Sequence, residues 1–160
     1  MPLSEQDPNL WDAAAIDEAE RLLQQASSYG RIGRFQLEAA VQSVHAARRT
    51  KGRTDWKAIL GLYDGLLELT GSPVVAVNRA VVLSETAGPE AGLAALDEFA
   101  RDTRLVGYQP YWAARADLLA RLGRRATADT AYAQAILLEP DTAVRGFLER
   151  RRARIRPNFA

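Results

Sequence analysis

Four polar side chains interrupt helical patterns that are otherwise apolar, and their chemistry suits the binding of a polypeptide. Asn78 and Arg79 follow a run of valines, whereas Arg115 and Asp117 lie among alanines and leucines. An Asn amide can hydrogen-bond the backbone of an extended peptide, and a guanidinium can fork onto a carboxylate. These four residues are therefore our candidates for a partner-binding groove.

Each candidate also has a structural interpretation. Asn78 could tie down a neighbouring helix end or loop, because most side-chain hydrogen bonds go to backbone or water. Arg115 could reach Asp64 or Glu85 and fix the angle between neighbouring helical hairpins, and we favour this role for it over ligand binding. Asp117 is the better groove candidate, and together with Asn78 it favours a ligand that carries donors as well as an acid.

Two basic clusters are the other candidate contact surfaces, and each could meet a nucleic-acid backbone or an acidic protein surface. Such runs are more often a solvated face or cations at a helix C-terminus. No aromatic residues interleave them, and the net charge of the chain is only +1, so we do not expect direct DNA binding. The clusters comprise Arg48, Arg49, Lys51 and Arg53, and Arg150, Arg151, Arg152 and Arg154, with Arg156 following.

The sequence offers no set of residues for catalysis, a metal or a cofactor. It has no Cys and one His, His45, which argues against thiolate chemistry, a His-based metal site and a catalytic triad. The carboxylates show no paired or metal-ligand spacing, and no Gly-rich phosphate loop is present. The apolar runs are shorter than the roughly 20 residues of a membrane span. We therefore expect a protein that is not an enzyme, needs no cofactor and has no membrane partner.

The stretch from Trp112 to Pro140 predicts how such side chains are positioned. It resembles one tetratricopeptide repeat, a helix–turn–helix unit of roughly 34 residues. Gly123 ends the first helix, because a residue without a Cβ adopts the left-handed conformation of a helix end. Small side chains let two antiparallel helices approach closely, and they alternate with bulky ones: Trp112, Ala116, Leu119, Ala128, Tyr132 and Ala135. One such unit cannot bury its own apolar face, so it predicts similar neighbours.

The rest of the chain supplies helical patterns at matching spacings. Superposing Ala80 on Ala116 also aligns Gly92 with Ala128 and Leu96 with Tyr132, an offset of 116 − 80 = 36 residues. The valine-rich segment from Val74 could be misread as a strand, but Ser72 and Pro73 form a helix start. We expect further helices over about 9–26, capped by Asn9, and over 34–48, 56–67, 74–83, 91–100 and 142–154, with 48–53 as a basic loop.

The predicted fold is therefore all-α, a right-handed tetratricopeptide-like α-solenoid of about eight antiparallel helices. Residues 1–8 form an extended lead-in, and residues 9–156 form one helical domain. The alternative is an ordinary helical bundle with coincidental spacing.

Many short stretches resemble the C-terminal extension of a group of extracytoplasmic-function RNA polymerase sigma factors, which ends in a tetratricopeptide-like domain. They cover most of the chain in the same order: Gln6-Asp7, Leu10-Trp11-Asp12, Phe35-Gln36-Leu37-Glu38-Ala39-Ala40, Val44-His45-Ala46, Thr54-Asp55-Trp56, Leu62-Tyr63-Asp64, Ser72-Pro73-Val74-Val75, Asn78-Arg79-Ala80-Val81, Gly88-Pro89, Arg115-Ala116-Asp117-Leu118-Leu119, Leu122-Gly123-Arg124 and Phe147-Leu148.

This resemblance implies a cytoplasmic, non-catalytic regulatory domain that acts in transcription initiation. It implies intramolecular or protein–protein contacts, with the sigma-factor core regions or RNA polymerase as partners. The family's promoter-reading and polymerase-binding regions precede this domain, and Met1 falls within the junction, so we expect an excised fragment rather than a stand-alone gene product. The alternative is a stand-alone scaffold or sensor that binds a peptide or small molecule in its concave groove. The oligomeric state, the signal and the partner's identity do not follow from the sequence.

Overall fold

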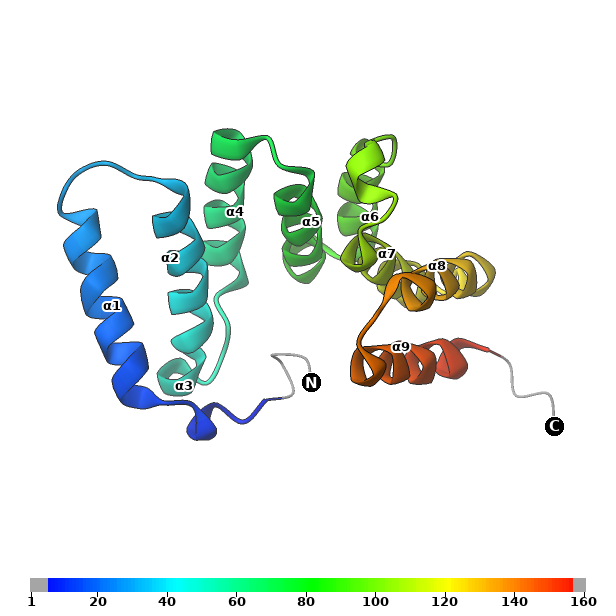
Figure 1. Ribbon diagram of the computed structural model, residues 1–160, viewed down its shortest axis with the longest axis horizontal. Helices are drawn as coiled ribbons and strands as arrows, with labels where there is room; N and C mark the ends of the chain where they lie inside the picture. The colour runs from blue at the N-terminus through cyan, green and yellow to red at the C-terminus, as the bar shows by residue number, and fades with distance from the viewer. Residues whose placement is uncertain (1–5, 157–160) are drawn as a thin grey trace. The chain divides into compact units, whose positions relative to one another are not determined.

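A computed structural model describes residues 6–156, and all regular secondary structure within that range is helical (Figure 1). The all-α prediction is therefore confirmed for this part of the chain. The elements are η2 (Pro8–Leu10), α1 (Ala13–Ser27), α2 (Arg34–Ala46), α3 (Arg48–Lys51), α4 (Trp56–Thr70), α5 (Pro73–Ala87), α6 (Pro89–Glu98), η3 (Thr103–Leu105), α7 (Gln109–Arg121), α8 (Arg125–Leu138) and α9 (Thr142–Ile155).

The chain divides into two compact units, Met1–Thr70 and Gly71–Ala160. The sequence interpretation treated residues 9–156 as one domain, whereas the boundary between these units falls at the Gly71-Ser72 turn between α4 and α5. Each unit has its own set of contacts between helices.

The first unit is built around α2, which contacts α1 on one side and α4 on the other (Figure 1). The prediction that Asn9 caps the first long helix is wrong. The Asp7 side chain accepts a hydrogen bond from the Asn9 backbone N–H at 2.9 Å, and this closes the separate short turn η2. The long helix α1 begins at Ala13, where the Asp12 side chain accepts from the Ala15 N–H at 3.0 Å.

The segment predicted as a basic loop, residues 48–53, is partly helical. Helix α3 occupies Arg48–Lys51 and ends at Gly52, whose φ of 68° is the left-handed conformation that glycine adopts without strain. The next helix, α4, begins at Trp56, and Asp55 Oδ1 caps it by accepting a hydrogen bond from the Ala58 N–H at 3.0 Å.

The second unit consists of the α5–α6 and α7–α8 helical hairpins and α9, with contacts between each helix and the next. The valine-rich α5 is a helix, as predicted, with Pro73 at its start. Ala80, Ala116, Ala128 and Ala135 are completely buried, so the small side chains predicted to let helices approach do lie in the core of this unit.

Gly92 marks the closest approach between α5 and α6. A Cβ atom at this position would lie 2.7 Å from Ser84 Cβ and 2.8 Å from the Ala80 carbonyl oxygen. Those distances are shorter than carbon atoms tolerate, so α5 and α6 can pack at this spacing only because residue 92 has no side chain.

Candidate functional site

A half-exposed stripe on α5 contains one of the predicted groove residues. Val74, Asn78, Val81 and Glu85 are three or four residues apart, so they share one face of the helix. Val74 and Val81 are each 39% exposed, and Asn78 is partly exposed. Among the described residues, the Asn78 side chain makes no hydrogen bond, and the structural alternative of tying down a helix end or loop has no contact to support it.

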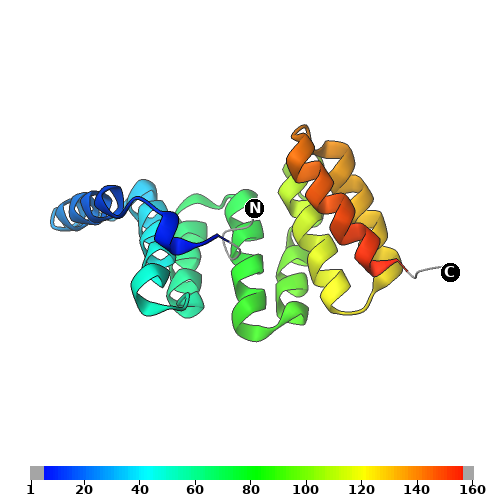
Figure 2. The same cartoon turned by 90° about the horizontal axis from the view of Figure 1, so that it is seen from below.

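One ion pair joins this stripe to α7, and a second joins α7 to α9. Arg121 Nη1 of α7 donates to Glu85 Oε1 of α5 at 2.7 Å. Arg151 Nη1 of α9 lies 2.7 Å from Asp117 Oδ1 of α7. The predicted groove residue Asp117 is therefore engaged within the chain. We call this surface of α5, α7 and α9 the linked face, and Figure 2 shows the three helices following one another across the second unit.

The linked face ends in an aromatic and cationic cluster at α9. The Arg151 guanidinium lies over the Phe147 ring, 5.5 Å from its centre. Below these side chains, burial and then the Asp117 carboxylate raise the pKa of Tyr132, while the Arg151 charge opposes the rise. The face therefore combines half-exposed valines, an amide and two guanidiniums, a mixture suited to polypeptide contacts.

Arg79 and Arg115 lie away from this stripe. Arg79 is next to Asn78 in sequence and thus about 100° around the helix from it. Arg115 of α7 donates through Nη1 to Asp97 Oδ1 of α6. The prediction that Arg115 reaches Asp64 or Glu85 is therefore wrong in its partner, although Arg115 does join neighbouring helical hairpins as expected. Glu85 instead forms an ion pair with Arg121, which lies nearer the C-terminal end of α7 than Arg115 does.

The first basic cluster is largely engaged by its own unit. Arg48 donates through Nη2 to the Gln6 carbonyl oxygen at 2.6 Å, and its guanidinium lies 5.4 Å from the centre of the Trp11 ring. Arg49 Nη2 lies 3.5 Å from Asp17 Oδ1, and its buried Nε has no hydrogen-bond partner among the described residues. Lys51 and Arg53 of this cluster are exposed.

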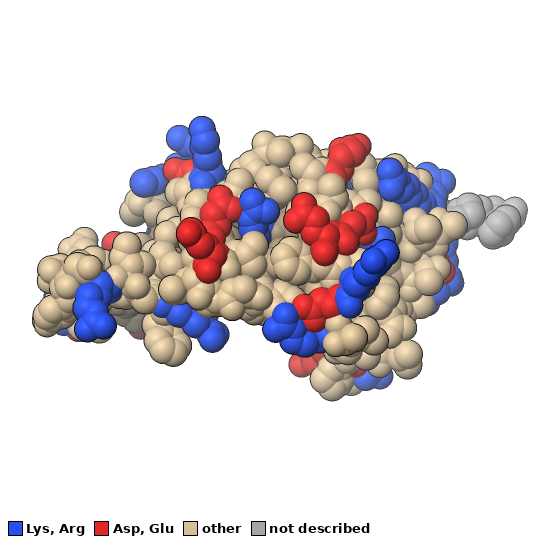
Figure 3. All heavy atoms as spheres, turned by 90° about the horizontal axis from the view of Figure 1, so that it is seen from above, with Lys and Arg blue, Asp and Glu red and all other residues tan. Residues whose placement is uncertain are grey.

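The second basic cluster fastens α9 to the rest of its unit. Asp129 of α8 accepts from Arg152 through both carboxylate oxygens at 2.8 Å and from Arg156 at 2.7 Å. These two guanidiniums hold the pKa of Asp129 well below its usual range. Arg151 is in the linked face, while Arg150 and Arg154 are exposed. Figure 3 shows acidic side chains interspersed with basic ones on the face seen from above.

His45 lies half-buried in the first unit, and burial lowers its pKa, with the nearby Arg48 charge acting in the same direction. Its ring meets Trp56 edge to face, with centres 5.8 Å apart. This ring contact is the interaction that the structure gives for the imidazole. Within residues 6–156, no group of three or more His, Asp or Glu side chains is placed to hold a metal ion.

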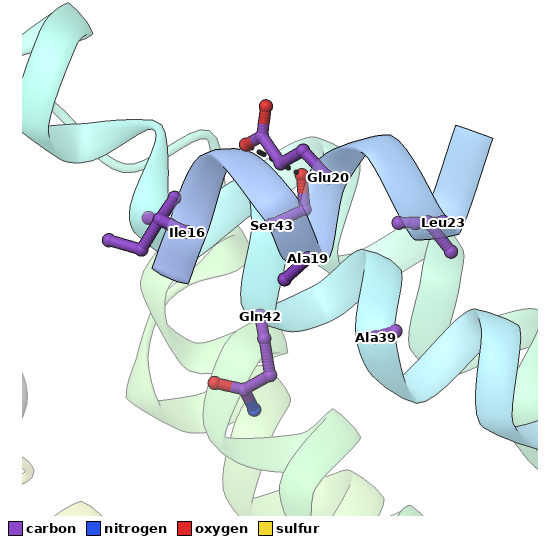
Figure 4. Close-up of a pocket in the computed structure, with 8 residues that line it drawn as sticks. Ile16, Ala19, Glu20, Leu23, Ala39, Gln42 and Ser43 are labelled. Atoms are coloured by element: carbon purple, nitrogen blue, oxygen red, sulfur yellow. Dashed lines mark hydrogen bonds between the residues drawn. The ribbon is translucent and has the colours of Figure 1, made fainter. Parts of the chain in front are cut away.

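An apolar groove between α1 and α2 was not predicted from the sequence. Its walls carry mostly small or apolar side chains, and the Glu20 carboxylate crosses it to accept a hydrogen bond from Ser43 Oγ at 3.3 Å (Figure 4). We call it the α1–α2 groove, lined by Trp11, Asp12, Ala15, Ile16, Ala19, Glu20, Leu23, Ala39, Gln42, Ser43 and Ala46. The sequence predicts the helix that carries Ile16, Ala19 and Leu23, but a helical apolar stripe does not reveal whether a neighbour covers it.

Comparison with known proteins gives one informative relative. The chain is 38% identical over 146 residues to an uncharacterized protein of Rhizobium meliloti, and the match covers 91% of this chain. The chain spans about a third of the length of that protein, 34%. No protein-family model matches the chain, and no solved structure matches it. Among the described residues, no helix combines the length and the apolar character needed to cross a membrane.

Proposed function

We propose that this chain is a protein-interaction domain of an extracytoplasmic-function RNA polymerase sigma factor. It regulates transcription initiation by contacting the sigma-factor core regions or RNA polymerase, and it has no catalytic role. The support for the family is the ordered series of sequence stretches described above. The support for an interaction role is the linked face of the second unit.

We further propose that the helices form a tetratricopeptide-like right-handed α-solenoid. The α5–α6 and α7–α8 hairpins favour this fold, since residues aligned by the 36-residue offset have similar environments. Ala80 and Ala116 are both completely buried on the first helix of each hairpin, and Leu96 and Tyr132 are both buried on the second. Arg121 also brings the C-terminal end of α7 beside that of α5, as in a pair of helices that run in the same direction. First helices that run parallel are expected of stacked repeats.

The observation that carries the interaction role is the connection of α5, α7 and α9 by surface ion pairs. Each ion pair is partly exposed: the Arg121 and Glu85 side chains are both 36% exposed. Such pairs contribute only about 0–1 kcal/mol to stability. A partner protein can therefore replace one member of a pair with a charged side chain of its own at little cost in free energy. Val74 and Val81 lie beside them and offer apolar area for the centre of an interface.

Direct DNA binding is not part of the proposal. In both basic clusters, several arginines are engaged in contacts within the chain, including Arg48 with Trp11 and Arg152 with Asp129. A guanidinium already held by a carboxylate must lose that partner before it can neutralise a phosphate.

A transcription assay reconstituted from RNA polymerase and the complete gene product tests the proposal. Val81→Arg places a bulky cation in the linked face, and Leu137→Arg makes the same kind of change on α8, where the side chain is 78% exposed. We expect Val81→Arg to change promoter-directed output by about tenfold, the effect of losing 1.4 kcal/mol at an interface. Leu137→Arg should leave it unchanged. Equal output from the two variants and the unmodified protein would remove the linked face from the proposal.

A further inference from the structure

The α1–α2 groove is an uncovered interface between two amphipathic helices. The α1 side chains that line it are spaced three and four residues apart, as in Ile16, Ala19 and Leu23, and α2 contributes a matching row. Two adjoining hollows, of about 250 Å³ and about 420 Å³, share Ile16, Ala19, Gln42 and Ala46. The groove therefore continues from the start of α1 almost to its end.

Small side chains explain why the two helices leave this space open. Ala19 of α1 faces the row that includes Ala39 and Ala46 of α2, and methyl groups cannot fill the angle between two helices (Figure 4). None of the α1 residues is buried, whereas α5 in the second unit has seven buried residues. The apolar stripe of α1 thus lacks the cover that helices of the second unit receive from their neighbours.

The dimensions suit a helix as the missing cover. From Asp12 to Leu23 the groove follows α1 for about 16 Å at 1.5 Å per residue, which is about three helical turns. A helix laid along it would place anchors at positions i, i+4 and i+7 between the walls. A loop or an extended strand would bring unsatisfied backbone groups against an apolar surface, which costs free energy.

The charges of the lining favour a basic occupant. It contains two carboxylates, of Asp12 and Glu20, and no Lys or Arg. Asp12 gives one oxygen to the α1 cap, and Glu20 gives one to Ser43. A carboxylate can accept further hydrogen bonds, so both can still receive a cationic donor. Arg48 is next to Trp11 at the Asp12 end of the groove, so Glu20, about two turns farther along α1, is the carboxylate more distant from that positive charge.

We propose that the α1–α2 groove docks a basic amphipathic helix of a partner protein. The apolar stripe of that helix fills the space between Ile16, Ala19 and the α2 wall, and its Lys or Arg residues face Asp12 and Glu20. The docked helix completes a layer that α1 and α2 leave open. This surface belongs to the first unit and does not depend on the proposed role of the linked face.

Two synthetic helical peptides of about 18 residues test the proposal with the full chain. Both carry leucines at three- and four-residue spacing, but one has Lys on its flank and the other has Glu. Fluorescence anisotropy of the labelled peptides at low salt gives their dissociation constants. We expect the Lys peptide to bind at least about tenfold more tightly than the Glu peptide, because only its charges complement the lining.

Substitutions on α1 locate the binding. Ala19→Lys inserts a cation into the groove and should weaken the Lys peptide by at least about tenfold. Ala14→Lys adds the same side chain to an exposed position of α1 outside the lining and should leave binding unchanged. Glu20→Gln should weaken binding by about threefold, whereas Glu18→Gln, which removes only the exposed pair with Arg21, should not.

Three results would overturn the proposal. The Glu peptide could bind as tightly as the Lys peptide, or Ala19→Lys could leave binding intact. The chain could also form a dimer by light scattering that Ala19→Lys disrupts, which would make a second copy the occupant. If far-UV circular dichroism shows that Ala19→Lys unfolds α1, Ala39→Lys on the opposite wall decides the matter by the same criteria.

Discussion

Replacing Gly92 by alanine tests how closely α5 and α6 approach. The new methyl carbon would lie 2.7 Å from Ser84 Cβ, 2.8 Å from the Ala80 carbonyl oxygen and 3.3 Å from Leu118 Cδ1. The carbonyl is part of the α5 backbone, and the Cβ is fixed to it. Neither atom can rotate away, so the two helices must separate to admit the methyl group.

The expected loss of stability follows from two opposing effects. Overpacking in a core costs about 1–3 kcal/mol, and two fixed contacts below 3.0 Å place Gly92→Ala near the upper end of that range. Alanine in place of glycine inside a helix returns about 1 kcal/mol. The net change is a destabilisation of about 2 kcal/mol, the difference between about 3 and about 1.

Urea denaturation monitored by circular dichroism and tryptophan fluorescence measures this change. Gly146→Ala is the matched control within the same unit, because it too lies inside a helix but its methyl group would meet only the mobile end of Arg150, at 3.4 Å. We expect the control to stabilise the protein by about 0.5–1 kcal/mol. A Gly92→Ala protein as stable as the unmodified chain would refute the close approach of α5 and α6.

Three further experiments test individual contacts and the α7–α8 turn in the second unit. Asp129→Asn should lower the free energy of unfolding by about 1 kcal/mol at pH 7, because a neutral amide binds Arg152 and Arg156 more weakly than a carboxylate does. Urea denaturation measures this change. Because the folded-state pKa of Asp129 is lowered, this contribution is present above the unfolded value of about 3.9 and disappears as the pH falls further. A double-mutant cycle should give a coupling of about 0.5–1 kcal/mol between Arg115 and Asp97 and none between Arg115 and Glu85. Gly123→Ala should destabilise the chain by about 1 kcal/mol, since φ is 71° at this helix end.

Each of these predictions has a result that contradicts it. The stability difference between Asp129→Asn and the unmodified chain should shrink below pH 4. If it stays constant there, the difference does not come from the ionised Asp129 carboxylate. Coupling of Arg115 to Glu85 would restore the partner first predicted from the sequence. Tolerance of Gly123→Ala would mean that the α7–α8 turn avoids the left-handed conformation.

The helices could be predicted because their signals are local. Ser72 and Pro73 identified the start of α5 and outweighed the strand propensity of its valines. The Asn9 cap was wrong for an equally local reason, since Asp7, Pro8 and Asn9 close a short turn of their own and leave the cap to Asp12.

The partners of charged side chains could not be predicted in the same way. Arg115 was assigned to Asp64 or Glu85, but it pairs with Asp97. Which carboxylate an arginine meets depends on the separation and rotation of the packed helices, and neither quantity can be read from the sequence. The long, flexible Arg side chain could reach several carboxylates on neighbouring helices. The α1–α2 groove was missed because the apolar stripe of α1 has the same spacing whether a neighbour covers it or not.

Cysteine labelling tests the proposed interaction role most directly, because the natural sequence contains no Cys and a single introduced thiol reports one site. Val81→Cys places the thiol on α5, and Val144→Cys places it on α9, seven residues before Arg151 and so on the same side of that helix. Leu137→Cys places the thiol on α8 as a control. The rate of maleimide labelling is measured in the complete gene product with and without RNA polymerase. The account predicts slower labelling at Val81→Cys and Val144→Cys when polymerase is bound and no change at Leu137→Cys. Equal rates at all three sites would contradict it.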